Sequence, residues 1–227
     1  MKLFLCGGGC GNQITEALQQ FEKLLDKTKP VLYVPLAMEE KMYDSCSEWF
    51  SGECKNFGCE KFEMVRSSLE LSEKNFDKYA AIFIGGGNTF KLLNEINQNG
   101  NREKIMNYLE NGGVVFGGSA GAIIFGKDIN TCLLDDGNEV GLECTTGLNL
   151  LNDYSILCHL NEKSLKDNME HLNNLSNNDK VIYMPEENVI FLDNNSTCLI
   201  GKSGCVIFEK GEHFARRPED FKNDIKK

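Results

Sequence analysis

The strongest restriction on the fold comes from short, continuous apolar runs separated by more polar, helix-like stretches. The runs cover residues 3–6, 31–36, 80–84, 114–116 and 156–158. A strand that is apolar along its whole length, rather than at alternate positions, is typically buried on both faces. We therefore predict a mostly parallel sheet with helices on both sides, because parallel strands need long crossover connections.

The stretches between the runs have helical character. They cover residues 12–26, 39–56, 88–97, 102–110 and 162–175. In the first of them, apolar residues recur at helical spacing on one face: Ile14, Leu18, Phe21, Leu24 and Leu25. After residue 180 the pattern changes to closely spaced strands, at 181–184, 189–192, 197–200 and 205–208. We predict that these strands form an antiparallel extension of the same sheet, and that the tail 216–227 forms a short surface helix or a frayed end. The whole chain, 1–227, is then a single α/β domain.

Composition narrows the function. The net charge of −10 argues against sequence-independent binding to nucleic acid or to anionic lipid. The ten cysteines are scattered without C-x-x-C spacing, which favours reduced thiols in a cytoplasmic protein. The apolar start, residues 3–5, is too short for a signal peptide, and no apolar run is long enough to cross a bilayer. We expect a monomer or homodimer whose partner is a small peptide or another small molecule.

Three glycine-rich segments each follow a predicted strand, at residues 7–12, 85–88 and 112–124. In an open parallel sheet, ligands bind where loops leave the carboxyl ends of the strands. The first segment does not match G-x-G-x-x-G, and the chain has no phosphate-binding P-loop motif, so no nucleotide cofactor is indicated. That segment is favoured as a tight turn. The second suits either an oxyanion or a turn that precedes a helix capped by Asn88 or Thr89.

The third segment contains G-x-S-x-G, formed by Gly117, Ser119 and Gly121. A strand, small residues and an apolar helix follow one another in the order of a nucleophile elbow, which lifts a serine out of a sharp turn. The helix that begins near Ala120 would direct its N-terminal dipole at developing negative charge. The competing interpretation is a turn of small residues between a strand and a helix, without a catalytic role.

A nucleophilic serine needs a base, and the chain offers three histidines. His159 follows an apolar strand and is the best candidate by position. His171 is expected to face solvent, and His213 is placed in a polar tail, 212–217, with no strand behind it. An orienting acid was sought between Ser119 and His159, where Asp128, Asp135, Asp136 and Glu143 are available. The positions of these four acids along the chain do not identify which of them orients the histidine. The interval from serine to histidine is too short for an α/β-hydrolase.

Four segments resemble a known family. They are I-G-G-G-N-T-F-K-L-L at 84–93, F-G-G-S-A-G-A at 116–122, G-L-N-L-L at 147–151 and M-P-E-E-N at 184–188. Together they resemble the peptidase family that contains aspartyl dipeptidase (dipeptidase E) and cyanophycinase. The resemblance extends from the first strand to about residue 208. It implies a three-layer, flavodoxin-like sandwich similar to that of class I glutamine amidotransferases.

The resemblance also implies roles for individual residues. Ser119 would attack the scissile carbonyl and His159 would transfer the proton, with Asp135 or Asp136 near the position of the orienting acid. The remaining expected site residues are the oxyanion-hole donors Gly86 or Gly87 and Ala120, and the substrate-binding residues Asn88, Glu186 and Glu187. No metal or cofactor is implied.

Two departures from the family pattern concern specificity. Residues 161–175 contain no arginine that could bind an aspartyl side chain. Glu187 replaces the glycine of the P-E-G-N element, which led to the hypothesis that Glu186 and Glu187 together hold a substrate ammonium.

The expected function is therefore a serine-type peptidase that acts on small peptides through an acyl-enzyme. A non-catalytic protein of the same fold, binding a small amino-acid-like ligand, is the main alternative. A glutaminase resembling the amidotransferases is a third possibility, weakened because Ser119 stands where those enzymes have a cysteine.

Overall fold

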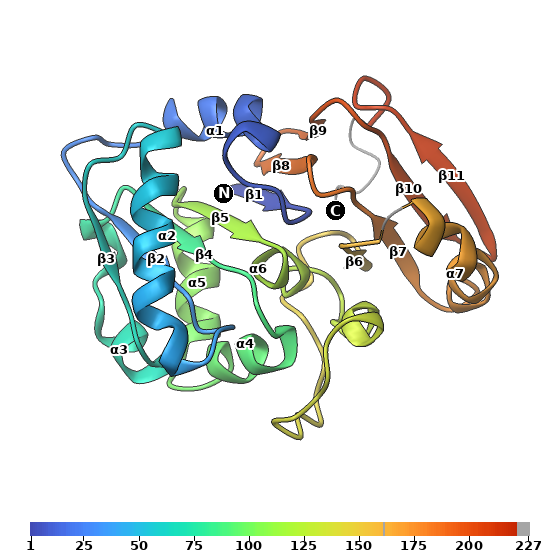
Figure 1. The fold of residues 1–227 in the computed structure, drawn as a ribbon, viewed down its shortest axis with the longest axis horizontal. Coiled ribbons are helices and arrows are strands. Elements are labelled where there is room, and N and C mark those ends of the chain that lie inside the picture. Colours follow the sequence, from blue (N-terminus) through green and yellow to red (C-terminus); the bar gives the residue numbers. More distant parts are fainter. Residues whose placement is uncertain (161, 222–227) are drawn as a thin grey trace.

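The larger of two sheets carries the predicted parallel strands (Figure 1). The computed structural model describes residues 1–160 and 162–221. The order of the larger sheet is β3-β2-β4-β5-β1-β8-β9, with the first five strands parallel and β8 and β9 antiparallel. Its strands are β1 (Lys2–Cys6), β2 (Val31–Val34), β3 (Phe62–Met64), β4 (Ala81–Ile84), β5 (Val114–Gly118), β8 (Val189–Asp193) and β9 (Thr197–Ile200). The prediction of a mostly parallel α/β sheet is confirmed.

A second sheet corrects one part of the prediction. Its order is β11-β10-β7-β6, formed by β6 (Tyr154–Leu157), β7 (Lys180–Tyr183), β10 (Cys205–Glu209) and β11 (Glu212–Arg216). Only β8 and β9 extend the main sheet. Strand β3 was not predicted, and β11 forms where the sequence indicated a polar tail without a strand, around His213. An apolar run indicates that a strand is buried, but it carries no information about which strand lies beside it. The final residues of the predicted tail, 222–227, lie outside the described residues.

Helices cover both faces of the main sheet and complete three layers (Figure 1). Helices α1 (Thr15–Glu22) and α2 (Tyr43–Asn56) share one apolar cluster with the sheet, whereas α3 (Ser68–Glu73), α4 (Thr89–Ile96) and α5 (Asn101–Glu110) share another. Helix α7 (Glu162–Leu175) packs on the second sheet through Leu172. The remaining helical segments are η1 (Gly11–Ile14), η2 (Glu40–Met42), η3 (Phe76–Lys78), α6 (Ala120–Ile123) and η4 (Asn130–Leu134).

None of these helices, as far as the described residues extend, has the length and apolar character needed to cross a membrane.

An aromatic cluster holds the middle of the main sheet against α1 and α2. The Phe83 and Phe116 rings stack with centroids 4.8 Å apart, and Phe4 stacks on Phe116 at 5.8 Å. Such pairs contribute about 0.5–1.5 kcal/mol each beyond the area they bury. The three rings belong to β4, β5 and β1, which are neighbours in the sheet. The cluster therefore fixes the three strands that lead into the glycine-rich segments.

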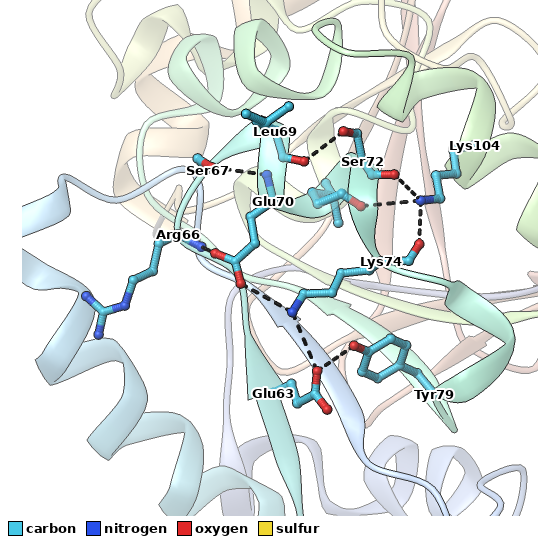
Figure 2. Close-up of polar contacts among 10 residues, drawn as sticks. Glu63, Arg66, Ser67, Leu69, Glu70, Ser72, Lys74, Tyr79 and Lys104 are labelled. Carbon is cyan, nitrogen blue, oxygen red and sulfur yellow. Dashed lines mark hydrogen bonds and ion pairs between the residues drawn. The ribbon is translucent and has the colours of Figure 1, made fainter.

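A polar network fastens α3 between β3 and α5 (Figure 2). Lys74 pairs with Glu70 at 3.3 Å and with Glu63 at 3.6 Å, and the Tyr79 hydroxyl donates to Glu63 at 2.5 Å. The ammonium of Lys104 donates to the backbone carbonyl oxygens of Ser72, at 2.6 Å, and of Lys74. Lys104 thereby caps the carboxyl end of α3, where orphan carbonyl groups need donors.

Replacing Lys104 with methionine is expected to lower the free energy of unfolding by about 2 kcal/mol, because hydrogen bonds to a charged donor are lost and the carbonyl groups are left unpaired. Burial lowers the pKa of Lys104, yet its charged form is held by these acceptors. Urea unfolding checks the prediction, with Lys202→Met as the control because Lys202 is exposed on a loop. Equal midpoints for the two variants would contradict it.

Candidate active site

The three glycine-rich segments converge at one edge of the main sheet. They follow β1, β4 and β5, whose order in the sheet is β4-β5-β1. Strand β8 runs antiparallel beside β1, with Val189 opposite Cys6. The residues just before β8 therefore reach the same edge as the residues just after β1. This topology brings the sequence around Glu186 to the glycine-rich segments.

Ser119 occupies the turn between β5 and α6 in a conformation that is rare for a residue other than glycine. Its φ is 53° and its ψ is −116°. Backbone in such a region costs about 1–3 kcal/mol and persists only where surrounding contacts hold it. The Ser119 N–H donates to the Cys6 carbonyl oxygen at 3.0 Å, which anchors the turn to β1. The turn thus has the strained geometry of a nucleophile elbow. Because α6 has only four residues, individual N–H groups rather than a long helix dipole are available there.

Glycine at position 117 allows this turn to close. A methyl group there would lie 2.1 Å from the carbonyl oxygen of Gly121. We expect Gly117→Ala to destabilise the fold by about 1–3 kcal/mol through this overlap. Gly118→Ala is a matched control, because a methyl group at the neighbouring position would meet nothing within 4 Å. Thermal unfolding of the two variants checks the prediction, which fails if they melt together.

His159 lies within hydrogen-bond distance of Ser119. The Oγ atom of Ser119 and the Nε2 atom of His159 are 2.6 Å apart. His159 follows β6 and has a φ of 63°, so its backbone too is in the left-handed region that is uncommon for a residue other than glycine. Gly8 leaves room for the imidazole, since a methyl group on Gly8 would lie 2.4 Å from His159 Cε1. The first glycine-rich segment, favoured in the sequence as a simple turn, therefore also shapes the space around this histidine.

The acid that contacts His159 is Glu186. Its Oε1 atom lies 3.0 Å from His159 Nδ1, on the side of the ring away from Ser119. The family resemblance implied Asp135 or Asp136 for the position of the orienting acid. Asp136 instead accepts hydrogen bonds from the Thr89 N–H at 2.9 Å and the Thr89 hydroxyl at 2.6 Å, while Asp135 is exposed. Both aspartates line a cavity of about 290 Å³ together with Ser119 and His159.

The two neighbouring glutamates have separate partners. Glu186 bonds to His159, whereas Glu187 accepts a hydrogen bond from the Ser203 hydroxyl. Glu186 is therefore already engaged at the histidine, which does not favour the hypothesis of a carboxylate pair holding an ammonium. Asn88, expected to bind substrate, uses its amide oxygen to cap α4 through the Lys91 N–H at 2.9 Å, and its amide nitrogen donates to the Gly137 carbonyl at 2.8 Å.

The expected oxyanion-hole residues border Ser119 from two sides. Gly86 faces it, since a methyl group on Gly86 would lie 3.1 Å from Ser119 Cβ. Gly87 lines the cavity that Ser119 and His159 share, and its φ of 132° is one that a side chain would disfavour. Ala120 follows Ser119 directly and is buried. All three positions therefore lie beside Ser119.

The thiols near Ser119 are poor competitors for the role of nucleophile. Burial raises the pKa of Cys6 and of Cys132 to about 12 each, and it also raises the pKa of Cys158. Since the thiolate is the reactive form, these groups stay neutral and unreactive at physiological pH. The Cys6 thiol donates to the Gly9 carbonyl oxygen at 3.3 Å and so supports the first glycine-rich segment.

The chain is a three-layer α/β protein with a serine–histidine–glutamate contact at the carboxyl ends of its parallel strands, and comparison with known sequences specifies the family. The profile of peptidase family S51 matches residues 3–200, so the chain belongs to that family. Peptidase E of Nostoc sp. (strain PCC 7120) is 27% identical over 206 residues, which cover 86% of this chain and 83% of that protein.

Solved structures agree on the fold. A candidate peptidase E protein from Listeria monocytogenes EGD-e superposes with a TM-score of 0.70 at 25% identity, covering 89% of this chain and 98% of the Listeria chain. A peptidase from an acI-B1 Actinobacterium superposes with a TM-score of 0.69 at 17% identity, covering 95% of this chain and 96% of the other. The resemblance drawn from the four sequence segments is confirmed.

Proposed function

We propose that the protein is a serine-type peptidase that hydrolyses small peptides through an acyl-enzyme on Ser119. The observation that carries the proposal is the continuous contact from Ser119 Oγ to His159 Nε2, and from His159 Nδ1 to the Glu186 carboxylate. Nucleophile, base and orienting acid in hydrogen-bond sequence are the arrangement by which a serine hydroxyl is activated.

In the proposed reaction, His159 Nε2 accepts the Ser119 proton while Oγ bonds to the scissile carbonyl carbon. Glu186 keeps the proton of the neutral imidazole on Nδ1 and stabilises the imidazolium that forms. His159 then gives the proton to the leaving amine, and an acyl-serine ester remains. Water, deprotonated by the same histidine, hydrolyses the ester and releases the product acid.

Backbone groups supply the other half of the proposed chemistry. When the carbonyl becomes tetrahedral, its oxygen gains negative charge and needs preorganised donors. We assign these donors to the N–H groups of Gly86 or Gly87, in the loop between β4 and α4, and of Ala120, the first residue of α6. In other acyl-transfer enzymes, one such donor is typically worth about 10²–10³ in rate.

An active-site label tests the proposal directly. A fluorophosphonate probe should modify the wild-type protein at Ser119, located by mass spectrometry of the labelled peptide, and should not modify Ser119→Ala. Ser51→Ala is the control, because Ser51 is exposed on α2 and lines neither cavity beside Ser119. A small-peptide library should then be cleaved by the wild type and by Ser51→Ala only. Equal labelling of all three proteins would refute the mechanism, and saturable peptide binding without cleavage would favour a non-catalytic binding protein.

We further propose that the protein works in a reducing compartment such as the cytoplasm. All ten cysteines are free thiols in the structure, and six of them are buried. Oxidising compartments usually select paired cysteines instead.

A further inference from the structure

An apolar cavity of about 330 Å³ opens beside Ser119 on the side of α2. Its walls come from β2, β4, β5 and α2, together with the segment that links β2 to α2. The side chains that give it its character are Tyr33, Met38, Met42, Trp49, Phe83 and Phe116. Gly86 and Ser119 also line it, so anything bound in the cavity lies next to the proposed acylation centre.

The aromatic wall of this cavity is built on the packed core. Tyr33 stacks on Phe50 with ring centroids 4.0 Å apart and planes within 6° of parallel, and Phe50 contacts Phe83 at 4.9 Å. Trp49 closes the outer side, 6.3 Å from Tyr33 and 6.4 Å from Phe83. It remains 43% exposed, which is unusual for so large an apolar side chain. Its exposed face is available to a ligand without any rearrangement of the core.

The charge in the cavity is negative. No lysine or arginine is among the described residues that line it, and its carboxylate is Glu53, which is 5% exposed. Glu53 Oε1 accepts from the Gly11 N–H at 3.0 Å, and Oε2 accepts from Asn56 Nδ2 at 2.8 Å. Oε1 therefore ties the first glycine-rich segment to α2, whereas Oε2 is held by a residue of α2 itself. An acidic ligand group would be buried next to this carboxylate without a cation, which is strongly unfavourable.

We propose that this cavity is the specificity pocket, and that it binds an apolar, preferably aromatic, side chain of a residue adjoining the scissile bond. This assignment rests on the proposed peptidase function and gives it a substrate class: short peptides with a phenylalanine-like or leucine-like residue. A cavity of about 150 Å³ lined by apolar side chains is enough to hold a benzene molecule, so the volume here admits a whole phenyl group. Aspartyl peptides are excluded by the same walls and charge.

Binding is measured first, independently of hydrolysis. Trp49 is the only tryptophan in the chain, so intrinsic fluorescence reports on occupation of this cavity. The Ser119→Ala variant is titrated with Ala-Ala and with dipeptides that carry Phe, Asp or Lys on either side of the peptide bond. We expect a saturable fluorescence change with a Phe dipeptide and an affinity about 10- to 100-fold above that for Ala-Ala, the gain expected from burying one phenyl side chain. Asp dipeptides are expected to bind no better than Ala-Ala.

Hydrolysis is measured second, on the wild type and two variants. Trp49→Ala is expected to lower the ratio of kcat/KM for the Phe dipeptide to that for Ala-Ala by about tenfold. Because Trp49 is largely at the surface, this variant is expected to fold, and calorimetric titration replaces fluorescence for it. Leu69→Ala is the control, since Leu69 is an exposed apolar residue of α3, outside this cavity, and the ratio should not change.

The outcomes separate the two proposals. Preference for Asp or Lys dipeptides, or a Phe preference insensitive to Trp49→Ala, overturns the cavity assignment even if Ser119-dependent hydrolysis is present. Tight Phe-dipeptide binding with no hydrolysis by the wild type refutes the peptidase mechanism and leaves the cavity assignment supported.

Discussion

Ser119→Ala is expected to lower kcat for the best peptide substrate by about 10⁵–10⁶-fold. The Ser119 hydroxyl is the protein group that bonds to the substrate carbonyl carbon in the proposed mechanism. Loss of the nucleophile in a comparable triad has an effect of this order. Alanine removes one oxygen atom from a residue whose N–H, bonded to the Cys6 carbonyl, stays in place. Single-turnover kinetics at high enzyme concentration can measure the residual rate.

A second substitution sharpens this prediction. His159→Ala should lower kcat to a similar extent, and the double variant should be no slower than either single one, because the two residues act as a unit. Independent, multiplicative losses would show that Ser119 and His159 do not work together. Ser51→Ala, at an exposed position of α2 outside both cavities, should retain nearly full activity.

Much of the fold follows from local sequence patterns. Continuous apolar runs identified β1, β2, β4 and β5 as buried parallel strands, and G-x-S-x-G placed Ser119 between a strand and a helix. These features are decided within a few residues of chain by burial and by backbone sterics. The backbone conformation of Ser119 agrees with the nucleophile elbow that this motif predicted. The contact between Ser119 and His159 is not local, because 40 positions of the chain separate the two residues.

The second sheet could not be predicted in the same way. Strands β6 and β7 are as apolar as the strands of the main sheet, and their own residues do not determine which partners they choose. The pairing of β7 with β10 and of β10 with β11 joins segments whose contacts are non-local. Strand β11 also escaped notice because its side chains are mostly exposed and polar. Strands are recognised in a sequence by their pattern of apolar residues, and β11 lacks such a pattern.

The contact between Glu186 and His159 was not predicted, for a related reason. The acids considered from the sequence lie between Ser119 and His159 in the chain. Glu186 lies after His159, and the antiparallel pairing of β8 with β1 brings it to the histidine. The sequence does contain a signal for a glutamate at the site, the M-P-E-E-N segment, but its two glutamates were interpreted as substrate-binding residues. A glutamate just before a strand that pairs beside β1 is well placed to reach the edge where the glycine-rich segments lie.

Glu186→Gln is expected to lower kcat by about 10³–10⁴-fold. Glutamine keeps the shape of the side chain and removes its charge, so the imidazolium loses its stabilising partner. The glutamine amide can also donate an N–H to His159 Nδ1, which favours the tautomer that carries its proton on Nε2. In that tautomer Nε2 cannot accept the proton of Ser119. Glu187→Gln is the matched control: its carboxylate bonds to Ser203, so activity should remain within a few-fold of wild type. Steady-state kinetics on both variants, with Asp135→Asn and Asp136→Asn beside them, decides which carboxylate orients His159. A larger loss in either aspartate variant would return that role to the acids first suggested by the sequence.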